Sequence, residues 1–383
     1  MNKRSIGKTG VEVFPLGLGV MRLPLYDGGT ASPTCSKDDI DVAASENMIR
    51  RAVELGVNYI DTAMPYAAGM SEAILGGALR KFGLRDKVYL ATKATPWLQN
   101  TPEDFDRHMA EQMRRLGTDH IDFYLIHSIN RHHWSEKVLP LGMIEHLMKA
   151  KADGRVGHIG FSFHDDFDLF REVLDYAPWD FCQIQLNYLD VACQAGLKGL
   201  RLAAERGMGV IIMEPLRGGY LAAVPDDVAE ALGRQKTPIE HALDFLWDMP
   251  EVSLLLSGCS MARQVEENVR YAERSSVGML TEAERAAYDR ARAQFSSRGT
   301  IPCTGCGYCR CPNGVVIPNN FNVYNEYITT GDRVRADEWY NIRVPLFGGK
   351  ASDCIGCGTC ETFCPQGIPI SEWMRKIDET LSD

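Results

Sequence analysis

The sequence predicts an α/β protein with two parts, a (β/α)8 barrel of the TIM type over residues 1–296 and a smaller, mostly helical domain over residues 297–383. Two observations carry this prediction: short apolar runs alternate with amphipathic segments up to residue 296, and eight of the 12 cysteines lie between Cys303 and Cys364. A chain of 383 residues is long enough for two or three domains of ~100–200 residues each. With 45% hydrophobic and 24% charged residues, its composition is that of a globular protein.

The first part alternates strands with helices. Short apolar, β-branched runs predict buried strands at Pro15–Val20, Val57–Ile60, Val88–Ala91, Ile121–Ile126, Val156–Phe161, Phe181–Ile184, Gly209–Met213 and Val252–Leu256. Amphipathic segments between them predict helices at Glu46–Leu55, Ser71–Lys81, Glu103–Leu116, Leu141–Ala152, Asp166–Tyr176, Leu197–Arg206 and Ala262–Tyr271. Eight such units in ~250 residues match a (β/α)8 barrel. A doubly wound dinucleotide fold is rejected because the first strand lacks the third glycine of that fingerprint, and Pro24 blocks the expected helix.

Polar residues follow the predicted strands at the point where each strand ends. They are Asp61, Lys93, His127, Ser162, Gln185, Asn187, Glu214 and Ser257. Since the carboxyl ends of all barrel strands meet at one face, where barrel enzymes keep their active sites, we expect these side chains to converge.

Four of the candidate residues form an ordered set, Asp61 and Tyr66 after the second strand, Lys93 after the third and His127 after the fourth. A tyrosine hydroxyl has an unperturbed pKa of ~10, and a neighbouring lysine ammonium lowers it toward the range of an efficient proton donor. With the opening Gly7–Gly10 and the stretch Gln183–Asn187, the set resembles the aldo-keto reductases over roughly residues 1–296. The resemblance implies that Tyr66 is the general acid of carbonyl reduction or alcohol oxidation, that Lys93 and Asp61 tune it, and that His127 orients the substrate oxygen.

The same resemblance implies a nicotinamide dinucleotide at the mouth of the barrel. Its expected contacts are Ser162, Gln183, Glu214, Ser257, Ser260, Gln264, Glu267 and Asn268. Members that select NADPH carry basic residues near the last strand, whereas this chain has Gly258 and Gln264 there with only Arg263 nearby, so NADH is expected at least as readily as NADPH. Trp97 and Trp134 are candidate walls of the substrate pocket, and His132 and His133 are interpreted as loop residues.

The clustered cysteines predict an iron–sulfur domain. The run Cys354-x2-Cys357-x2-Cys360-x3-Cys364-Pro has the spacing of bacterial ferredoxins. The run Cys303-x2-Cys306-x2-Cys309-x1-Cys311-Pro is similar, but its last cysteine comes two residues early, which leaves the ligand role of Cys311 open. Zinc is the alternative, because paired C-x2-C motifs also bind it.

The crossing rule of two-cluster ferredoxins predicts two [4Fe–4S] clusters. Cys303, Cys306, Cys309 and Cys364 would bind one cluster, and Cys311, Cys354, Cys357 and Cys360 would bind the other. The spacer Asn320–Arg343, expected to form one or two helices, resembles that of helical dicluster ferredoxins. The whole chain resembles a group of aldo-keto reductases that carries a C-terminal [4Fe–4S] domain.

The two halves exchange electrons differently, since a nicotinamide transfers a hydride and a cluster transfers single electrons. Passing electrons between a nicotinamide and a cluster normally requires a flavin, for which the sequence has no signature.

Three hypotheses about function follow. The first is an NAD(P)H-dependent reductase of small carbonyl compounds with clusters for electron transfer, structure or sensing. The second is a reductase of a carbonyl or activated C=C bond that an external ferredoxin feeds. The third is a redox-sensing or electron-carrying subunit with a non-catalytic barrel.

Charge and hydropathy exclude other classes. A net charge of −10 argues against a nucleic-acid partner, and no apolar run reaches the ~18 residues of a membrane span. Residues 1–10 carry no apolar signal segment and the cysteines lack the pattern of a secreted disulfide scaffold, so a cytoplasmic protein is expected. The sequence does not define the oligomeric state.

Overall fold

A closed barrel of eight parallel strands forms the larger part of the computed structural model, which describes residues 2–31 and 35–382. The strand order is β10-β3-β4-β5-β6-β7-β8-β9. Its strands are β3 (Leu16–Gly19), β4 (Tyr59–Asp61), β5 (Tyr89–Ala94), β6 (Ile121–Ile129), β7 (Val156–Phe163), β8 (Phe181–Gln185), β9 (Gly209–Met213) and β10 (Leu254–Ser257). The barrel prediction is therefore confirmed, and each predicted strand overlaps an observed one.

Aromatic and aliphatic side chains fill the amino-terminal half of the barrel. Phe123 contacts Tyr59 and Phe181, with ring centroids 5.3 and 5.1 Å apart. The sequence analysis missed a short hairpin, β1 (Arg4–Ser5) and β2 (Glu12–Val13), whose Val13 belongs to this core cluster together with Ile6. Because apolar side chains occupy this end, the polar side chains remain at the opposite, carboxyl end of the strands.

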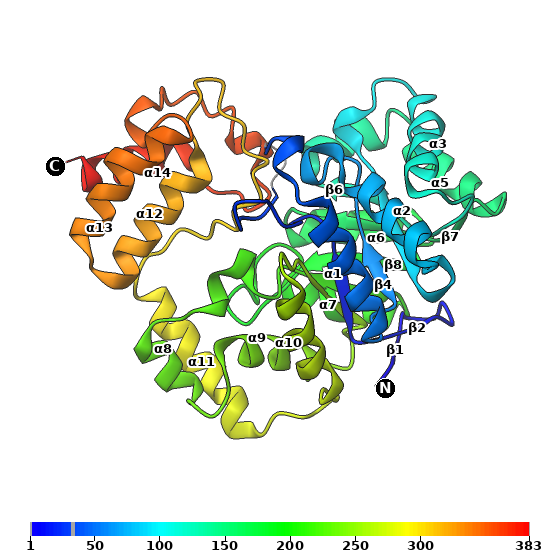
Figure 1. Cartoon of the computed structure of the whole chain (residues 1–383), viewed down its shortest axis with the longest axis horizontal. Helices are drawn as coiled ribbons and strands as arrows, with labels where there is room; N and C mark the ends of the chain where they lie inside the picture. The colour runs from blue at the N-terminus through cyan, green and yellow to red at the C-terminus, as the bar shows by residue number, and fades with distance from the viewer. Residues whose placement is uncertain (1, 32–34, 383) are drawn as a thin grey trace. The chain divides into compact units, whose positions relative to one another are not determined.

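Helices alternate with the barrel strands along the chain (Figure 1). They are α1 (Val42–Glu54), α2 (Ser71–Phe82), α3 (Asp104–Leu116), α5 (Met143–Ala152), α6 (Phe167–Tyr176), α7 (Gly196–Glu205), α9 (Pro238–Trp247) and α10 (Ala262–Glu273). The side chains of Asp41 and Asp166 accept hydrogen bonds from the first turns of α1 and α6, which defines where those helices begin. Gly83 and Gly117 end α2 and α3 in the left-handed conformation.

The chain divides into two compact units. The first contains residues 1–215 and 243–279, and the second contains residues 216–242 and 280–383. The second unit is helical, with α8 (Asp226–Leu232), α11 (Glu282–Ser296), α12 (Ile317–Thr330), α13 (Arg333–Glu338) and α14 (Ile370–Leu381). α8 and α11 thus group with the cysteine region although both precede residue 297, and the boundary at 296 stays a prediction.

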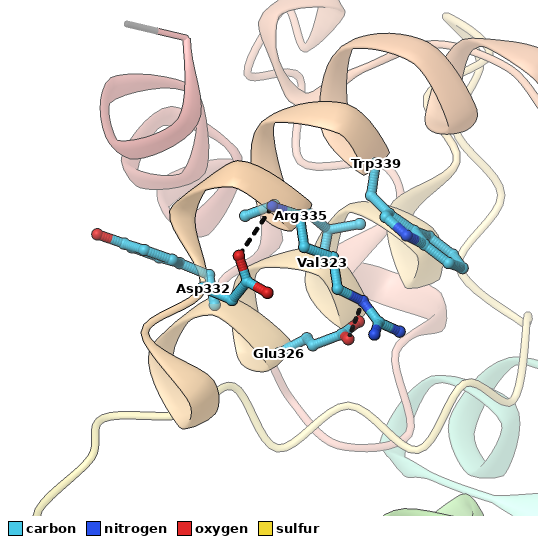
Figure 2. A pocket seen from close by; sticks show the side chains of 7 residues that line it. Val323, Glu326, Asp332, Arg335 and Trp339 are labelled. Atoms are coloured by element: carbon cyan, nitrogen blue, oxygen red, sulfur yellow. Dashed lines mark hydrogen bonds and ion pairs between the residues drawn. The ribbon is translucent and has the colours of Figure 1, made fainter.

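The spacer between the cysteine runs forms two helices, α12 and α13, followed by a single π turn at Trp339–Arg343. Figure 2 shows the shallow hollow between them, where Arg335 Nε donates to Glu326 Oε1 at 2.7 Å. The guanidinium also lies 5.8 Å from the Trp339 ring centroid. Asp332 accepts from the backbone of Arg335 and so fixes the start of α13. Both members of the Arg335–Glu326 ion pair line the hollow.

The core of the second unit lies beneath the cysteine segments. Phe321, Tyr340 and Met374 are buried in it, and Cys360 belongs to the same cluster.

Among the described residues, no helix is long and apolar enough to cross a membrane.

Candidate active site and cysteine centre

Asp61, Lys93 and His127 lie on three adjacent strands at the carboxyl end of the barrel. Asp61 ends β4, Lys93 is in β5, and His127 is in β6; all three are buried. Lys93 Nζ donates to Asp61 Oδ1 at 2.5 Å and to the carbonyl oxygen of Thr62 at 2.8 Å. Two strands of the barrel therefore hold a buried ion pair.

Tyr66 completes the set from the loop between β4 and α2. Its ring lies over the Lys93 ammonium, 4.7 Å from nitrogen to centroid, and its hydroxyl oxygen is 3.4 Å from His127 Nε2. The carbonyl of Tyr66 accepts from the amides of Gly69 and Ser71, which closes a tight turn before α2. The structure thus places Tyr66 beside both Lys93 and His127, as the sequence predicts.

Burial determines the charge state of the site. It lowers the pKa of Lys93 and raises that of Asp61, while each group stabilises the charged form of the other as its counter-ion. Burial and the Lys93 ammonium hold the pKa of His127 well below its usual value of 6.5. His127 is therefore a neutral imidazole at pH 7, able to make hydrogen bonds to substrate without carrying charge.

A second layer of polar residues, which the sequence analysis did not assign, supports Lys93. Gln112 on α3 donates to the carbonyl of Lys93 at 3.0 Å and to Glu72 Oε1 at 2.7 Å. Tyr124 donates to Gln112 Oε1 at 2.6 Å. The available signal was Gln112 itself, a polar residue at a buried helical position in series with Met109.

Three of the residues expected to contact the nicotinamide lie on, or directly after, the strands that follow β6. Ser162 Oγ accepts from the amide of Ser128 at 2.7 Å, and Gln183 Nε2 donates to Asp61 Oδ2 at 3.3 Å. Glu214 directly follows β9 with φ 57°, and its carbonyl accepts from Asn187 Nδ2 at 3.3 Å. The three residues come from consecutive barrel strands, with Ser162 in β7, Gln183 in β8 and Glu214 directly after β9.

The other expected dinucleotide contacts gather where β10 meets α10. Asn268 Nδ2 donates to Ser257 Oγ at 2.9 Å, and the amide of Ser260 donates to Gln264 Oε1 at 2.8 Å. Glu267 pairs with the exposed Arg263 at 2.8 Å.

The N-cap residue of the 12-residue helix α10, Met261, makes no side-chain hydrogen bond to the first turn, whose amides can therefore bind an anionic phosphate. Arg22, which no sequence motif indicated, also lies here, with its Cδ 3.6 Å from where a Cβ on Gly258 would be. These features fit a dinucleotide.

The two candidate pocket walls differ. Trp97 contacts His127, with ring centroids 5.0 Å apart. Trp134 instead packs against α6, where its Nε1 donates to Glu172 Oε1 at 2.6 Å and its ring meets Tyr176 edge-on. The interpretation of Trp134 as a pocket wall is therefore wrong, because its indole N–H takes a partner on the outer helix layer.

The cysteines of the second unit fall into two groups that draw from both runs. Burial, then Cys306, Cys303 and Cys364, raise the pKa of Cys309. In the second cysteine run, burial and then the neighbouring thiols Cys311 and Cys354 raise the pKa of Cys360 to about 11. Thiols influence one another in this way only when they lie close together. The structure thus brings Cys364 to the first run and Cys311 to the second.

The surroundings of these thiols fit iron–sulfur clusters. Gly305, Gly356 and Gly358 have φ of 66–70°, a left-handed conformation, and a Cβ on any of them would meet no atom within 4 Å. The amide of Gly305 points at Cys303 Sγ at 3.4 Å, as amides do toward cluster sulfurs.

Among the residues that the structure describes, no three His, Cys, Asp or Glu side chains form a group that could hold a single metal ion. In a cubane each thiolate binds a different iron atom, so its four ligands are spaced more widely than those of a single ion.

A parallel barrel with a buried Lys–Asp pair, a tyrosine and a neutral histidine at the carboxyl ends of its strands defines a reductase type of site. The model of the aldo/keto reductase family matches residues 15–285, and that of a 4Fe-4S dicluster domain matches residues 302–368. The chain belongs to the aldo/keto reductase family, whose members are NAD(P)-dependent oxidoreductases, and carries a 4Fe-4S domain at its C-terminal end.

Several known proteins are similar to this chain. The NADH-specific methylglyoxal reductase of Escherichia coli is 30% identical, over 70% of this chain and 93% of its own. The aldo-keto reductase YhdN of Bacillus subtilis is 34% identical, but this match covers 45% of the present chain and only 51% of YhdN. The structure of aldo-keto reductase AKR11C1 from Bacillus halodurans has a TM-score of 0.63 at 24% identity, covering 76% of this chain and 96% of that one. The last comparison concerns the fold.

Proposed function

We propose that the protein reduces a small aldehyde or ketone with NAD(P)H, or oxidises the corresponding alcohol, with Tyr66 as the general acid–base residue. The observation that carries this proposal is the buried Lys93–Asp61 pair beneath the Tyr66 ring, with the hydroxyl directed to His127. A buried ion pair costs folding free energy unless hydrogen bonds satisfy both charges. We attribute the presence of this pair to its effect on the Tyr66 hydroxyl, which lies beside it.

The four residues divide the work of carbonyl reduction. A bound nicotinamide supplies the hydride that the carbonyl carbon accepts. Tyr66 donates its hydroxyl proton to the carbonyl oxygen as negative charge develops there. The Lys93 ammonium stabilises the resulting tyrosinate, and Asp61 keeps Lys93 charged and directed. Neutral His127 holds the substrate oxygen by a hydrogen bond within reach of Tyr66.

Dinucleotide binding is assigned to the strand ends beyond the catalytic set. Ser162 accepts from the Ser128 amide and so directs its own hydroxyl hydrogen toward a carboxamide oxygen. We assign the adenosine end to the start of α10. NADH serves at least as well as NADPH because Arg263, the basic residue of this turn, is paired with Glu267.

The second unit is assigned two [4Fe–4S] clusters, which supply one-electron transfer when bound. The grouping of Cys364 with the first run and of Cys311 with the second supports the crossed ligand sets. The cysteine spacing is that of iron–sulfur ligands and not of a secreted disulfide scaffold, which supports a reducing, cytoplasmic compartment.

A second candidate function is favoured by the exposure of one predicted ligand. Cys357 is exposed, and Ile355, two residues before it, has 70% of its surface exposed. An exposed ligand allows a cluster to receive electrons from an external ferredoxin, which would feed the reduction of a carbonyl or activated C=C bond. Reduction of the clusters by dithionite-treated ferredoxin, without nicotinamide, would distinguish this route.

The test of the main proposal is Tyr66→Phe. This variant removes the acidic hydroxyl and keeps the ring over Lys93, so NAD(P)H-dependent reduction of a test aldehyde should fall about 10²–10⁴-fold. Iron content and nicotinamide binding should be unchanged, as measured by iron analysis and by quenching of protein fluorescence. Wild-type turnover in this variant would remove Tyr66 from the catalytic role.

A further inference from the structure

The backbone directly after His127 is held in an unusual conformation. Ser128 has φ 53°, a left-handed conformation that residues with a side chain rarely adopt. The pairing of β6 with β7 shifts register at the same place, between Ile126 and Ile129. Left-handed residues of this kind persist only where neighbouring groups impose the conformation. The amide of Ser128 shares a rigid peptide plane with the carbonyl of His127, so holding Ser128 in place limits the backbone conformation of His127.

Two hydrogen bonds fix the peptide groups of Ser128. Its amide donates to Ser162 Oγ at 2.7 Å, and its carbonyl lies 2.8 Å from His133 Nδ1. Burial lowers the pKa of His133, so its ring is neutral and Nδ1 carries the hydrogen that the carbonyl accepts. Asn130 Oδ1 accepts from the backbone amide of His133 at 2.8 Å and so places the residue on the short turn Arg131–His133.

A second path joins His133 to His127 through Trp97. The Trp97 ring stacks on His133 at 5.2 Å and 26°. The same indole lies 5.0 Å from the His127 ring at 42°. Trp97 therefore lies between the two imidazoles, and the position of one ring limits the position of the other.

We propose that His133 is a positioning residue of the catalytic site, which directs His127 at the substrate oxygen through the carbonyl of Ser128 and through Trp97. This inference rests on the proposed carbonyl reduction. It assigns a role to a residue that the sequence analysis interpreted as part of a loop, and it makes the turn after β6 a part of the active site.

Two substitutions separate the paths. His133→Asn keeps an N–H near the position of Nδ1 and removes the ring, whereas His133→Phe keeps the stacking ring and removes the donor. His132→Phe is the matched control, because His132 is the adjacent histidine and is exposed. With 4-nitrobenzaldehyde as the substrate, we expect kcat of His133→Phe to fall about 10- to 100-fold, since small misplacements of a catalytic group have effects of this size. The kcat of His133→Asn should fall less, about three- to tenfold, because this variant keeps the N–H for the Ser128 carbonyl and loses only the ring that stacks on Trp97.

Two further readouts distinguish positioning from a general loss of structure. Nicotinamide affinity should be the same in wild type and all three variants, and the ¹⁵N resonances of the His127 ring should move in His133→Phe but not in His132→Phe. Unchanged kcat and unchanged His127 resonances in His133→Phe would overturn the inference. So would losses of kcat that parallel losses of thermal stability in both His133 variants. If wild type bound nicotinamide but reduced no aldehyde, the proposed function would fail, while the ring spectra would still test His133.

Discussion

The barrel site and the cysteine centre are built in opposite ways. In the barrel, strands carry Asp61, Lys93 and His127, and buried hydrogen bonds fix each side chain. In the second unit, the cysteines lie on irregular segments whose glycines have open space around them. A barrel holds its site by its own packing, whereas cysteine loops depend on the inorganic group that they bind. Variants should therefore affect the two regions separately.

The largest effect is expected from breaking the buried ion pair. Lys93→Met leaves the Asp61 carboxylate buried without its counter-ion, which costs about 3–5 kcal/mol of unfolding free energy. Aldehyde reduction should also fall about 10²-fold or more. In the double variant Lys93→Met/Asp61→Asn, we expect the free energy of unfolding to recover, as measured by chemical denaturation. Aldehyde reduction should not recover, as measured by steady-state kinetics. Loss of iron from either variant would contradict the separation of the two regions.

Iron content tests the crossed ligand sets. Cys311→Ser and Cys357→Ser should each lose about half of the bound iron, and the double variant should lose no more than either single one, because both belong to one predicted cluster. Combining Cys357→Ser with Cys306→Ser should remove nearly all of it. Cys193→Ser, outside both groups, is the control. Full iron content in Cys311→Ser would show that the early cysteine is not a ligand.

The smallest expected effect concerns acid stability of the barrel. Burial lowers the pKa of His164 to about 4 from 6.5. Between pH ~6.5 and pH ~4 the unfolded chain binds a proton at His164 that the folded chain does not. The contribution of this residue to the free energy of unfolding is therefore fully present above pH ~6.5, and about 1–3 kcal/mol is lost as the pH falls toward ~4. His164→Gln should flatten this dependence in urea denaturation at pH 7 and pH 5. His132→Gln should not, and equal slopes for His164→Gln and wild type would disprove the assignment.

Much of the barrel and of its site could be predicted because the signals are local. Apolar β-branched runs end in Asp61 and Lys93, and the parallel fold brings those ends together. Gln112 gave a signal as a polar residue on the buried face of a helix, but its partners Lys93 and Glu72 are distant in sequence. The contact proposed for His133 could not be predicted, since it depends on the left-handed backbone of Ser128. α11 was missed although its signal was present: Thr281 and Glu284 form a capping box at its start.

The chain passes from one compact unit to the other more than once. It leaves the first unit after Pro215, returns at Leu243 and leaves again after Met279. Arg298 pairs with Asp227, which precedes the return. A gene truncated just before the cysteine runs would still encode α8 and α11 with the Arg298–Asp227 ion pair, and would lose α12, α13 and α14. The family models nevertheless match successive stretches, residues 15–285 and 302–368, so a deletion that removes the cysteine region leaves the sequence matched by the reductase family intact.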